Sequence, residues 1–202
     1  MAKRAAPEVN AGSMADIAFL LLIFFLVTTT IEKDSGITRK LPPIEESEED
    51  VIIKQKNIFT VLINKNDQLL VEDEVMEIKS LRQAAVEFLD NNGDGSCSFC
   101  QGKKDGSSSD NPDKAIISLA NDRETSYAAY ISVQNELVAA YNQLRNRRAL
   151  QIGPQKGFSG MDFVKMQQTY DDVRWTGNKE KLKEVIDQIK IEIPQKLSEV
   201  QQ

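Results

Sequence analysis

The chain has 202 residues, with 25 Lys and Arg against 31 Asp and Glu, and its net charge is −6. This length allows one membrane anchor and one soluble domain of ordinary size. The acidic balance, without Arg clusters interleaved with aromatic residues, argues against a nucleic-acid partner. Histidine is absent, which removes His-dependent general-base catalysis and His-ligated zinc, so any protons that the chain handles must travel on carboxylates.

An apolar run near the N-terminus predicts a transmembrane helix over residues 12–31, about 30 Å long. Asp16 is the only ionisable residue in this run. A charge at the centre of such a helix costs roughly 2.5–3.5 kcal/mol on insertion scales, and less near the interface. Two interpretations remain open: Asp16 functions against a partner helix or a water path, or it favours the helix dipole and caps the N-terminus.

Lys3 and Arg4 before the apolar run are also typical of a cleaved signal peptide. However, the exit at residues 27–34 has no small-x-small cleavage site, and Asp16 falls where a signal peptide is most apolar. We therefore expect an uncleaved anchor, with residues 1–11 in the cytoplasm and the bulk of the chain on the other side.

Residues 32–56 are predicted to form a tether. Pro42 and Pro43 are followed by an acidic run at residues 45–50, a composition that favours an extended, self-repelling segment. The tether allows the soluble domain to sit some distance from the bilayer.

The folded part begins with a predicted hairpin, because β-branched and aromatic residues flank a polar turn. Spacings of three and four between apolar residues predict amphipathic helices, and glycines with Pro154 predict an irregular segment up to Trp175. The order is ββαβα followed by a C-terminal α/β addition. It predicts a small two-layer α+β domain at 57–150, with helices on one face of a sheet, and an extension at 151–202. The predicted elements are strands at 57–63, 68–71 and 115–120, helices at 78–90, 126–148 and 179–189, and an edge strand at 195–200.

A polar loop insertion at 91–113 contains two motifs. Asp90, Asn92 and Asp94, with Gly95 behind them, match the opening of an EF-hand calcium loop, but the twelfth position is Gln101 rather than Glu. A weak calcium site and a solvated turn therefore both remain open.

The second motif is a lone pair of cysteines, Cys97 and Cys100. Zinc needs further Cys or His ligands, which the chain lacks. In an oxidising compartment we expect a local disulfide, with a small effect on stability because it closes a short loop.

The N-terminal pattern resembles that of the ExbD/TolR biopolymer-transport family. Members have Ile-Asn-Val-x-Pro-x-x-Asp leading into a single transmembrane helix and Leu-Pro beyond it. Val9 and Asn10 match the opening pair and Asp16 matches the aspartate, whereas Ser13 stands where the family has Pro. Leu41-Pro42 matches the dipeptide, and the ββαβα domain is similar to the family's periplasmic domain.

The resemblance implies an inner-membrane subunit of a proton-driven motor in a Gram-negative cell, with Asp16 carrying the protons and no cofactor. The implied partners are an ExbB/TolQ-type polytopic channel subunit, a second copy of the chain as a homodimer, membrane lipid and a TonB-like protein. Asn10 and Ser13 would support the membrane segment. Thr28 and Thr29 either hydrogen-bond across helices or bond to carbonyls of their own helix.

Other functional classes remain as alternatives. A TolR-like, membrane-anchored module would bind peptidoglycan or an envelope protein through the periplasmic domain. A flagellar-stator protein should carry a larger wall-binding domain, for which there is no pattern. An enzyme is disfavoured, because no nucleophile–base pair can be assembled without His.

Overall fold

The computed structural model describes residues 11–28 and 54–201. The chain divides into two compact units, Met1–Asp50 and Val51–Gln202. Helix α1 (Ala11–Thr28) belongs to the first unit, and a sheet with the remaining helices forms the second. Each unit is described by itself below.

A five-stranded mixed sheet is the centre of the second unit, with strand order β3-β2-β1-β4-β5. The first three strands form an antiparallel meander, whereas β4 and β5 run parallel to β1 and extend the sheet on its other side. A short 3-10 helix, η1 (Gln55–Asn57), leads into the first strand. The strands are β1 (Ile58–Ile63), β2 (Leu69–Val71), β3 (Glu74–Met76), β4 (Ile116–Asn121) and β5 (Leu197–Gln201).

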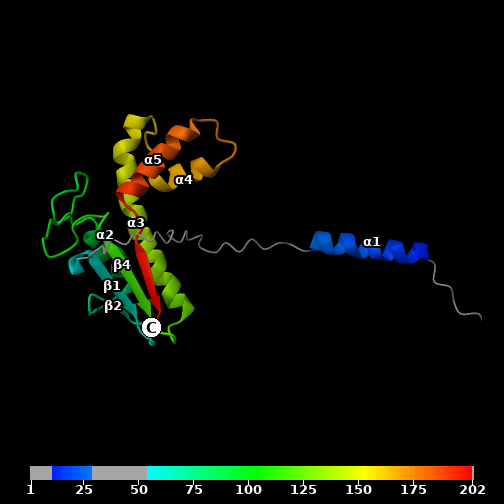
Figure 1. Ribbon diagram of the computed structural model, residues 1–202, viewed down its shortest axis with the longest axis horizontal. Helices are drawn as coiled ribbons and strands as arrows, with labels where there is room; N and C mark the ends of the chain where they lie inside the picture. Colours follow the sequence, from blue (N-terminus) through cyan, green and yellow to red (C-terminus); the bar gives the residue numbers. More distant parts are fainter. Residues whose placement is uncertain (1–10, 29–53, 202) are drawn as a thin grey trace, which may run out of the picture. The chain divides into compact units, whose positions relative to one another are not determined.

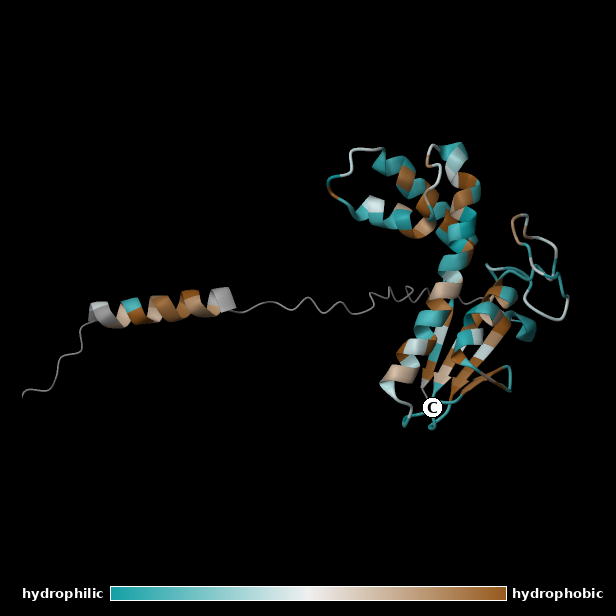
Figure 2. Cartoon of the chain, turned by 180° about the vertical axis from the view of Figure 1, so that it is seen from behind, coloured by the Kyte–Doolittle hydropathy of each residue, from teal (hydrophilic) through white to brown (hydrophobic). Residues whose placement is uncertain are grey.

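Helices α2 (Ile78–Leu89) and α3 (Tyr127–Lys156) pack against each other and cover one face of this sheet. Figure 1 shows the sheet in front of these helices, and Figure 2 shows them from behind. Alternate residues of β1 point towards them, so Phe59, Val61 and Ile63 are buried in the main core. The period of two in a strand thus leaves the intervening residues on the opposite face, which none of the helices described within residues 54–201 covers.

A second hydrophobic cluster lies beyond the sheet, where the end of α3 meets α4 (Phe163–Asp171) and α5 (Lys179–Glu192). With 30 residues, α3 is about 45 Å long and contributes to both clusters. It ends at Gly157, whose positive φ of 90° allows the N–H of Phe158 to return to the carbonyl of Gly153 at 2.8 Å. Side-chain caps from Asp162 and Asn178 then start α4 and α5.

Strand β5 is held in place by two side chains of α3. The Arg145 guanidinium donates two hydrogen bonds to the carbonyl of Ile193, at 3.0 and 2.9 Å, and the Tyr141 hydroxyl donates one to the carbonyl of Lys196 at 3.3 Å. Both side chains are buried. They fix the link between α5 and β5, so the last strand can pair with β4.

The structure confirms the mixed α+β class and corrects several details. Strand β3 was missed, because it is short and follows a turn at Glu72 and Asp73 that contains neither Gly nor Pro. The prediction of an irregular segment from Gly153 to Trp175 was wrong. Helix α3 continues through Gly153 and Pro154 to Lys156, and residues 163–171 form α4. Pro154 lies in the last turn of α3 and has no N–H to donate to the carbonyl of Leu150.

Candidate functional site

The first candidate site is Asp16 in α1. The residue is exposed, and the large apolar side chains described along the helix are also exposed, with Ile17, Phe19 and Leu20 each about 60% accessible. Figure 2 shows α1 as predominantly hydrophobic, with one hydrophilic position near its first turns. At 100° per residue, Asp16 shares a helix face with Gly12 and Leu20. The carboxylate therefore lies on an apolar helix that presents its side chains outward.

Within residues 11–28 and 54–201, no helix reaches the combination of length and apolar character that crossing a bilayer requires. The predicted span at 12–31 includes residues 29–31, which lie outside the described residues. Asn10 and Thr29, predicted to support the membrane segment, also lie outside them. Ser13 and Thr28 lie within α1, without a description of their side chains. The membrane span thus stays a prediction.

A second candidate site is the loop insertion, which packs as an ordered structure rather than a flexible loop. The amide of Asn91 donates to the carbonyls of Asp105 and Ser109, both at 2.8 Å, and its oxygen accepts the N–H of Asp105 at 3.0 Å. Asn92 binds the N–H and the carbonyl of Cys97 in the same manner, both at 2.9 Å. These two buried amides add to the backbone hydrogen bonds of the loop, such as the one from the N–H of Gly93 to the carbonyl of Ser109 at 2.9 Å.

The loop is fixed to the helices through Asp90 and Phe99. Arg147 of α3 binds both carboxylate oxygens of Asp90, which also accepts the N–H of Gln101 at 3.2 Å. The guanidinium of Arg148 lies over the Phe99 ring, 4.5 Å from its centroid, and pairs with Glu192 at the end of α5 at 2.6 Å. Burial raises the pKa of Glu192, but the bonds from Arg148 and Gln188 outweigh it and lower the pKa overall.

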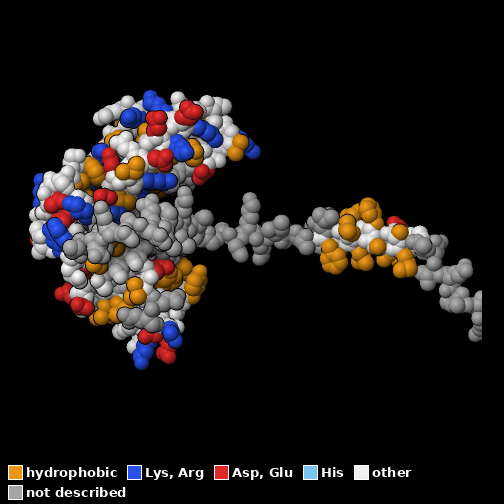
Figure 3. Space-filling model, in the orientation of Figure 1, with side chains coloured by type: hydrophobic (Ala, Val, Ile, Leu, Met, Phe, Trp, Pro, Cys, Tyr) orange, Lys and Arg blue, Asp and Glu red, His pale blue; other side chains and the backbone are white. Residues whose placement is uncertain are grey.

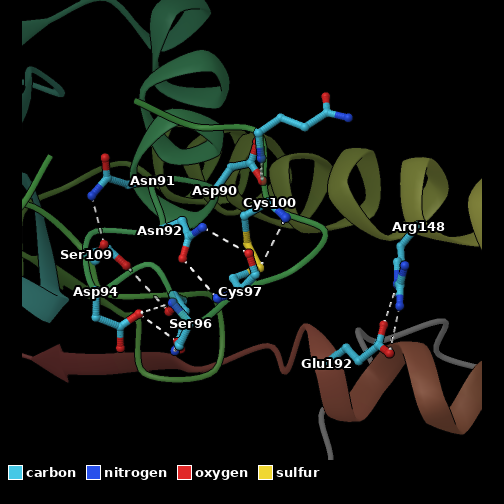
Figure 4. The surroundings of a disulfide bond; sticks show 12 residues. Asp90, Asn91, Asn92, Asp94, Ser96, Cys97, Cys100, Ser109, Arg148 and Glu192 are labelled. Atoms are coloured by element: carbon cyan, nitrogen blue, oxygen red, sulfur yellow. Dashed lines mark hydrogen bonds and ion pairs between the residues drawn. A yellow bond between two sulfur atoms is a disulfide. The ribbon is translucent and has the colours of Figure 1, made fainter. Parts of the chain in front are cut away.

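Cys97 and Cys100 form a disulfide in the structure, with Cα atoms 5.6 Å apart (Figure 4). The bond closes the turn that presents Phe99 to Arg148. Beside it lies a shallow pocket of about 330 Å³, lined by the cysteine turn, Pro112 and the exposed Ile191 of α5.

The three predicted calcium ligands lie in this loop, but each is engaged by a neighbouring group. Asp90 is bound by Arg147, the oxygen of Asn92 accepts the N–H of Cys97, and Asp94 pairs with Lys114 at 2.7 Å. The hydrogen bond from Lys114 lowers the pKa of Asp94 well below its usual range. Among the described residues, no group of three or more Asp, Glu, Cys or His side chains is arranged to hold a metal ion. A calcium ion would therefore compete with Arg147 for Asp90 and with Lys114 for Asp94. The calcium site stays a prediction.

Asp110 connects the loop to the start of the folded domain, a role that sequence reasoning missed. Its buried carboxylate pairs with Lys56 at 2.5 Å and Lys54 at 3.6 Å, and its N–H donates to the side chain of Asn57 at 2.8 Å. The hydrogen bond from Lys56 is the main cause of a lowered pKa for Asp110. The partners are more than fifty residues apart in sequence, so no local pattern could reveal the contact. The point where the predicted tether enters the domain is thus fixed to the insertion.

Comparison with known proteins gives two matches. The family model described as "Biopolymer transport protein ExbD/TolR" matches residues 2–149. "Biopolymer transport protein exbD2" of Vibrio cholerae serotype O1 (strain ATCC 39315 / El Tor Inaba N16961) is 30% identical over 87 residues. This alignment spans 43% of the chain and 61% of that relative, so the two are matched over part of their lengths.

Helices α4 and α5 and strand β5 lie beyond the family match. The family is a non-enzymatic transport family whose members work in complexes with other transport proteins. Because the family model covers most of its length, the chain belongs to the ExbD/TolR family of biopolymer transport proteins.

Proposed function

We propose that this chain is a subunit of a proton-driven motor in the inner membrane of a Gram-negative bacterium. It works with an ExbB/TolQ-type channel subunit and supplies mechanical work to a TonB-like protein for outer-membrane transport. Family membership supports an anchored protein with a role in energy transduction. The observation that carries the motor mechanism is Asp16, placed on a helix whose described large side chains are apolar and exposed.

The chemistry of the motor rests on the two protonation states of Asp16. Protonated, the side chain is tolerated in an apolar seam, and ionised it must face a polar partner or water. Alternation between these states changes the angular position that the helix prefers within a channel, which is a two-state element driven by charge. A proton that crosses a potential of roughly 150 mV supplies about 3.5 kcal/mol, several times RT.

The soluble unit would receive this motion through the segment that precedes it. Lys54 and Lys56 stand at its entry, and both pair with the buried Asp110. A pull on the chain before residue 54 is therefore applied to the loop insertion as well as to β1. We expect the ion pairs of Lys54 and Lys56 with Asp110 to transmit the movement to the whole unit. In this proposal the N-terminus lies in the cytoplasm and residues 51–202 lie in the periplasm.

The experiment replaces Asp16 by Asn, which keeps the size and hydrogen-bonding capacity of the side chain but removes its titration. We expect normal abundance and co-purification with the channel subunit, and loss of proton-driven transport. Asp16→Glu retains a carboxyl group and should retain part of the activity. Ala18→Ser, on the face of α1 opposite Asp16, is the matched control and should transport normally. Full transport by Asp16→Asn would remove the proposal.

A second candidate function is that of a passively anchored binding module for peptidoglycan. A pocket of about 460 Å³ lies at the end of β4 and the start of α3, and Tyr127, Tyr130 and Asn121 are among its lining residues. Aromatic rings beside amide groups suit the stacking and hydrogen bonding of a saccharide. Pull-down of residues 51–202 with purified cell wall tests this function. Retention that Tyr127→Ala abolishes would support it, and absence of retention would exclude it.

A further inference from the structure

The Cys97–Cys100 disulfide lies at the surface of the insertion and joins residues only three positions apart. A bond that closes so short a loop contributes little to the stability of the fold. The insertion is ordered instead by the buried amides of Asn91 and Asn92 and by the ion pairs of Asp110. Breaking the disulfide should therefore leave the insertion folded, so the bond is available for chemistry.

A pocket leads to the sulfur of Cys97. Both cysteines are partly exposed, and Cys97, unlike Cys100, lines the pocket of about 330 Å³ beside the turn. Pro112 and Ile191, which is 74% exposed, form an apolar wall of the same pocket. Exposed disulfides exchange with thiols more readily than buried ones do. An external thiolate can therefore reach the Cys97 sulfur through this pocket.

The exchange is balanced when the reductant is a dithiol. One thiolate of the reductant attacks Cys97 Sγ, a mixed disulfide forms, and the bond to Cys100 breaks with Cys100 leaving as a thiolate. The second thiolate of the reductant then attacks the reductant's own sulfur in the mixed disulfide and releases Cys97. Two electrons and two protons pass to the cysteines, and the reductant is left as a disulfide.

Two features of the turn favour these steps. The N–H of Cys100 lies 3.2 Å from Cys97 Sγ and would stabilise the thiolate that forms there. Because Cys100 is only three residues away, it would expel a monothiol from Cys97 before a second molecule arrived. A dithiol carries its second thiol with it and completes the reduction.

The turn that the disulfide closes places the Phe99 ring between the main core and α3. The ring packs against the main core, and the guanidinium of Arg148 lies 4.5 Å from its centroid. The same guanidinium binds both carboxylate oxygens of Glu192, at 2.6 and 3.0 Å (Figure 4). Phe99 therefore covers one side of an ion pair and excludes water from it, which strengthens the pair.

This ion pair ties the end of α5 to α3. Glu192 is the last residue of α5, and Ile193 and β5 follow it. Helices α4 and α5 pack against α3 and against each other. In Figure 3, basic and acidic side chains are mixed over the upper part of the second unit, where Figure 1 places these helices. With a hydrated exterior of this kind, the position of α5 depends on the contacts of its inner face and of its end.

We propose that the Cys97–Cys100 disulfide is a site of thiol–disulfide exchange with a dithiol. Its oxidised state holds Phe99 against Arg148 and so fixes the end of α5. In the reduced state the turn loses its covalent closure, the ring moves off the guanidinium, and water reaches the Arg148–Glu192 pair. The end of α5 then becomes more mobile while the rest of the domain keeps its fold. The inference does not depend on proton transfer in the predicted membrane segment, so its tests are independent of the motor.

Reduction of the folded, full-length chain tests the site. The chain has only two cysteines, so mass spectrometry after thiol labelling measures the reduced form directly. We expect dithiothreitol to reduce the bond without denaturant, within the minutes to hours of uncatalysed exchange, while the domain stays folded. A bond that is reduced only after unfolding in urea, or reduction that unfolds the domain, would overturn the inference.

Single-cysteine variants test which sulfur is attacked. Cys100→Ser keeps the N–H of residue 100 beside Cys97, so its remaining thiol should react with an aromatic disulfide reagent at least about tenfold faster than the thiol of Cys97→Ser. Equal reactivity of the two thiols would overturn the approach through the pocket.

A variant of the pocket wall distinguishes a protein dithiol from a small one. Ile191→Glu puts a charge into the apolar wall beside Cys97. Slower reduction of this variant by reduced thioredoxin, with an unchanged rate for dithiothreitol, would identify a protein as the source of the dithiol. Unchanged rates for both probes would identify a small dithiol, and failure of both to reduce the folded wild-type chain would overturn the inference.

Hydrogen exchange tests the consequence of reduction for α5. We expect the amides of residues 188–193 to exchange about two- to thirtyfold faster in the reduced chain, the range that loss of a cation–π contact implies. Amides that pair β1 with β2 should not change. Phe99→Leu keeps an apolar side chain against the core and removes the aromatic ring, so reduction of this variant should have no further effect on α5.

The matched control is Ser98→Ala in the same turn, which should respond to reduction as wild type does. Unchanged exchange in α5 after reduction of the wild-type chain, or an increase spread over the whole domain, would overturn the inference.

Discussion

Replacing Arg145 by Met should release β5 from the sheet. Arg145 lies one turn after Tyr141 on α3, 8% exposed, with its guanidinium 5.3 Å from the centre of the Phe163 ring. Burial lowers its pKa, and no carboxylate pairs with it among residues 54–201. Its role is to supply two N–H donors to the carbonyl of Ile193. Met keeps the unbranched stem in the same apolar surroundings and removes both donors.

The cost follows from these contacts. Hydrogen bonds to charged groups contribute about 1.5–3 kcal/mol, and a buried carbonyl left without a donor costs about 1–3 kcal/mol. Removing a buried charge that has no counter-ion recovers part of this loss. We therefore expect a decrease of about 2 kcal/mol in the free energy of unfolding. The matched control is Arg82→Met, because Arg82 pairs with Glu136 at 2.7 Å on the surface and should cost no more than about 1 kcal/mol.

Denaturant unfolding of residues 51–202 measures the total loss, and hydrogen exchange locates it. In the Arg145→Met variant we expect faster exchange of the amides that pair β4 with β5, and unchanged protection between β1 and β2. Tyr141→Phe, which loses one bond to the carbonyl of Lys196, should show a smaller effect in the same place, about 0.5–1.5 kcal/mol. A loss below about 0.5 kcal/mol, or a loss spread evenly over the sheet, would refute this account of β5.

Two further predictions concern the loop insertion. Because Lys56 lowers the folded-state pKa of Asp110, the ionised carboxylate stabilises the fold at neutral pH, and this contribution is lost as the pH falls below the ordinary Asp value towards the lower folded pKa. Asp110→Asn should therefore be less stable than wild type by about 1–3 kcal/mol at pH 7, with a gap that narrows in acid, and urea titrations from pH 7 to pH 3 measure it. A constant gap over that range would exclude the carboxylate as its source. Cys97→Ser with Cys100→Ser should cost no more than about 2 kcal/mol, because the closed loop is short. Unfolding of the whole domain by reductant alone would contradict this.

Local patterns predicted most of the elements of the second unit, residues 51–202. The β-branched run that became β1, the apolar spacing of α2 and the apolar face of α5 each appear within a short window of sequence. In α4, Phe163 and Met166 follow the cap Asp162 at helical spacing, but the nearby glycines and Pro154 concealed the signal. Gly153 is required where the chain turns back, since an added Cβ would lie 2.7 Å from the carbonyl oxygen of Phe158.

Long-range contacts could not be predicted in the same way. The pairing of β5 with β4 depends on Tyr141 and Arg145, whose partners are 55 and 48 residues away. The ordered structure of the insertion depends on the buried side chains of Asn91 and Asn92. It could not be predicted, because asparagine in a polar loop is equally typical of a solvated turn. Asp16 stands out in the sequence because its signal is local, one carboxylate in an apolar run, and its role in carrying protons stays a prediction.

The central claim is that the carboxyl group of Asp16 carries protons for the motor, and proton flux measures this most directly. In vesicles that contain the chain with its channel subunit, an imposed gradient should drive proton entry through wild type. Asp16→Asn should abolish the flux although the assembled complex persists. Undiminished flux in that variant, with assembly verified, would contradict the account and leave a tethered domain without a motor.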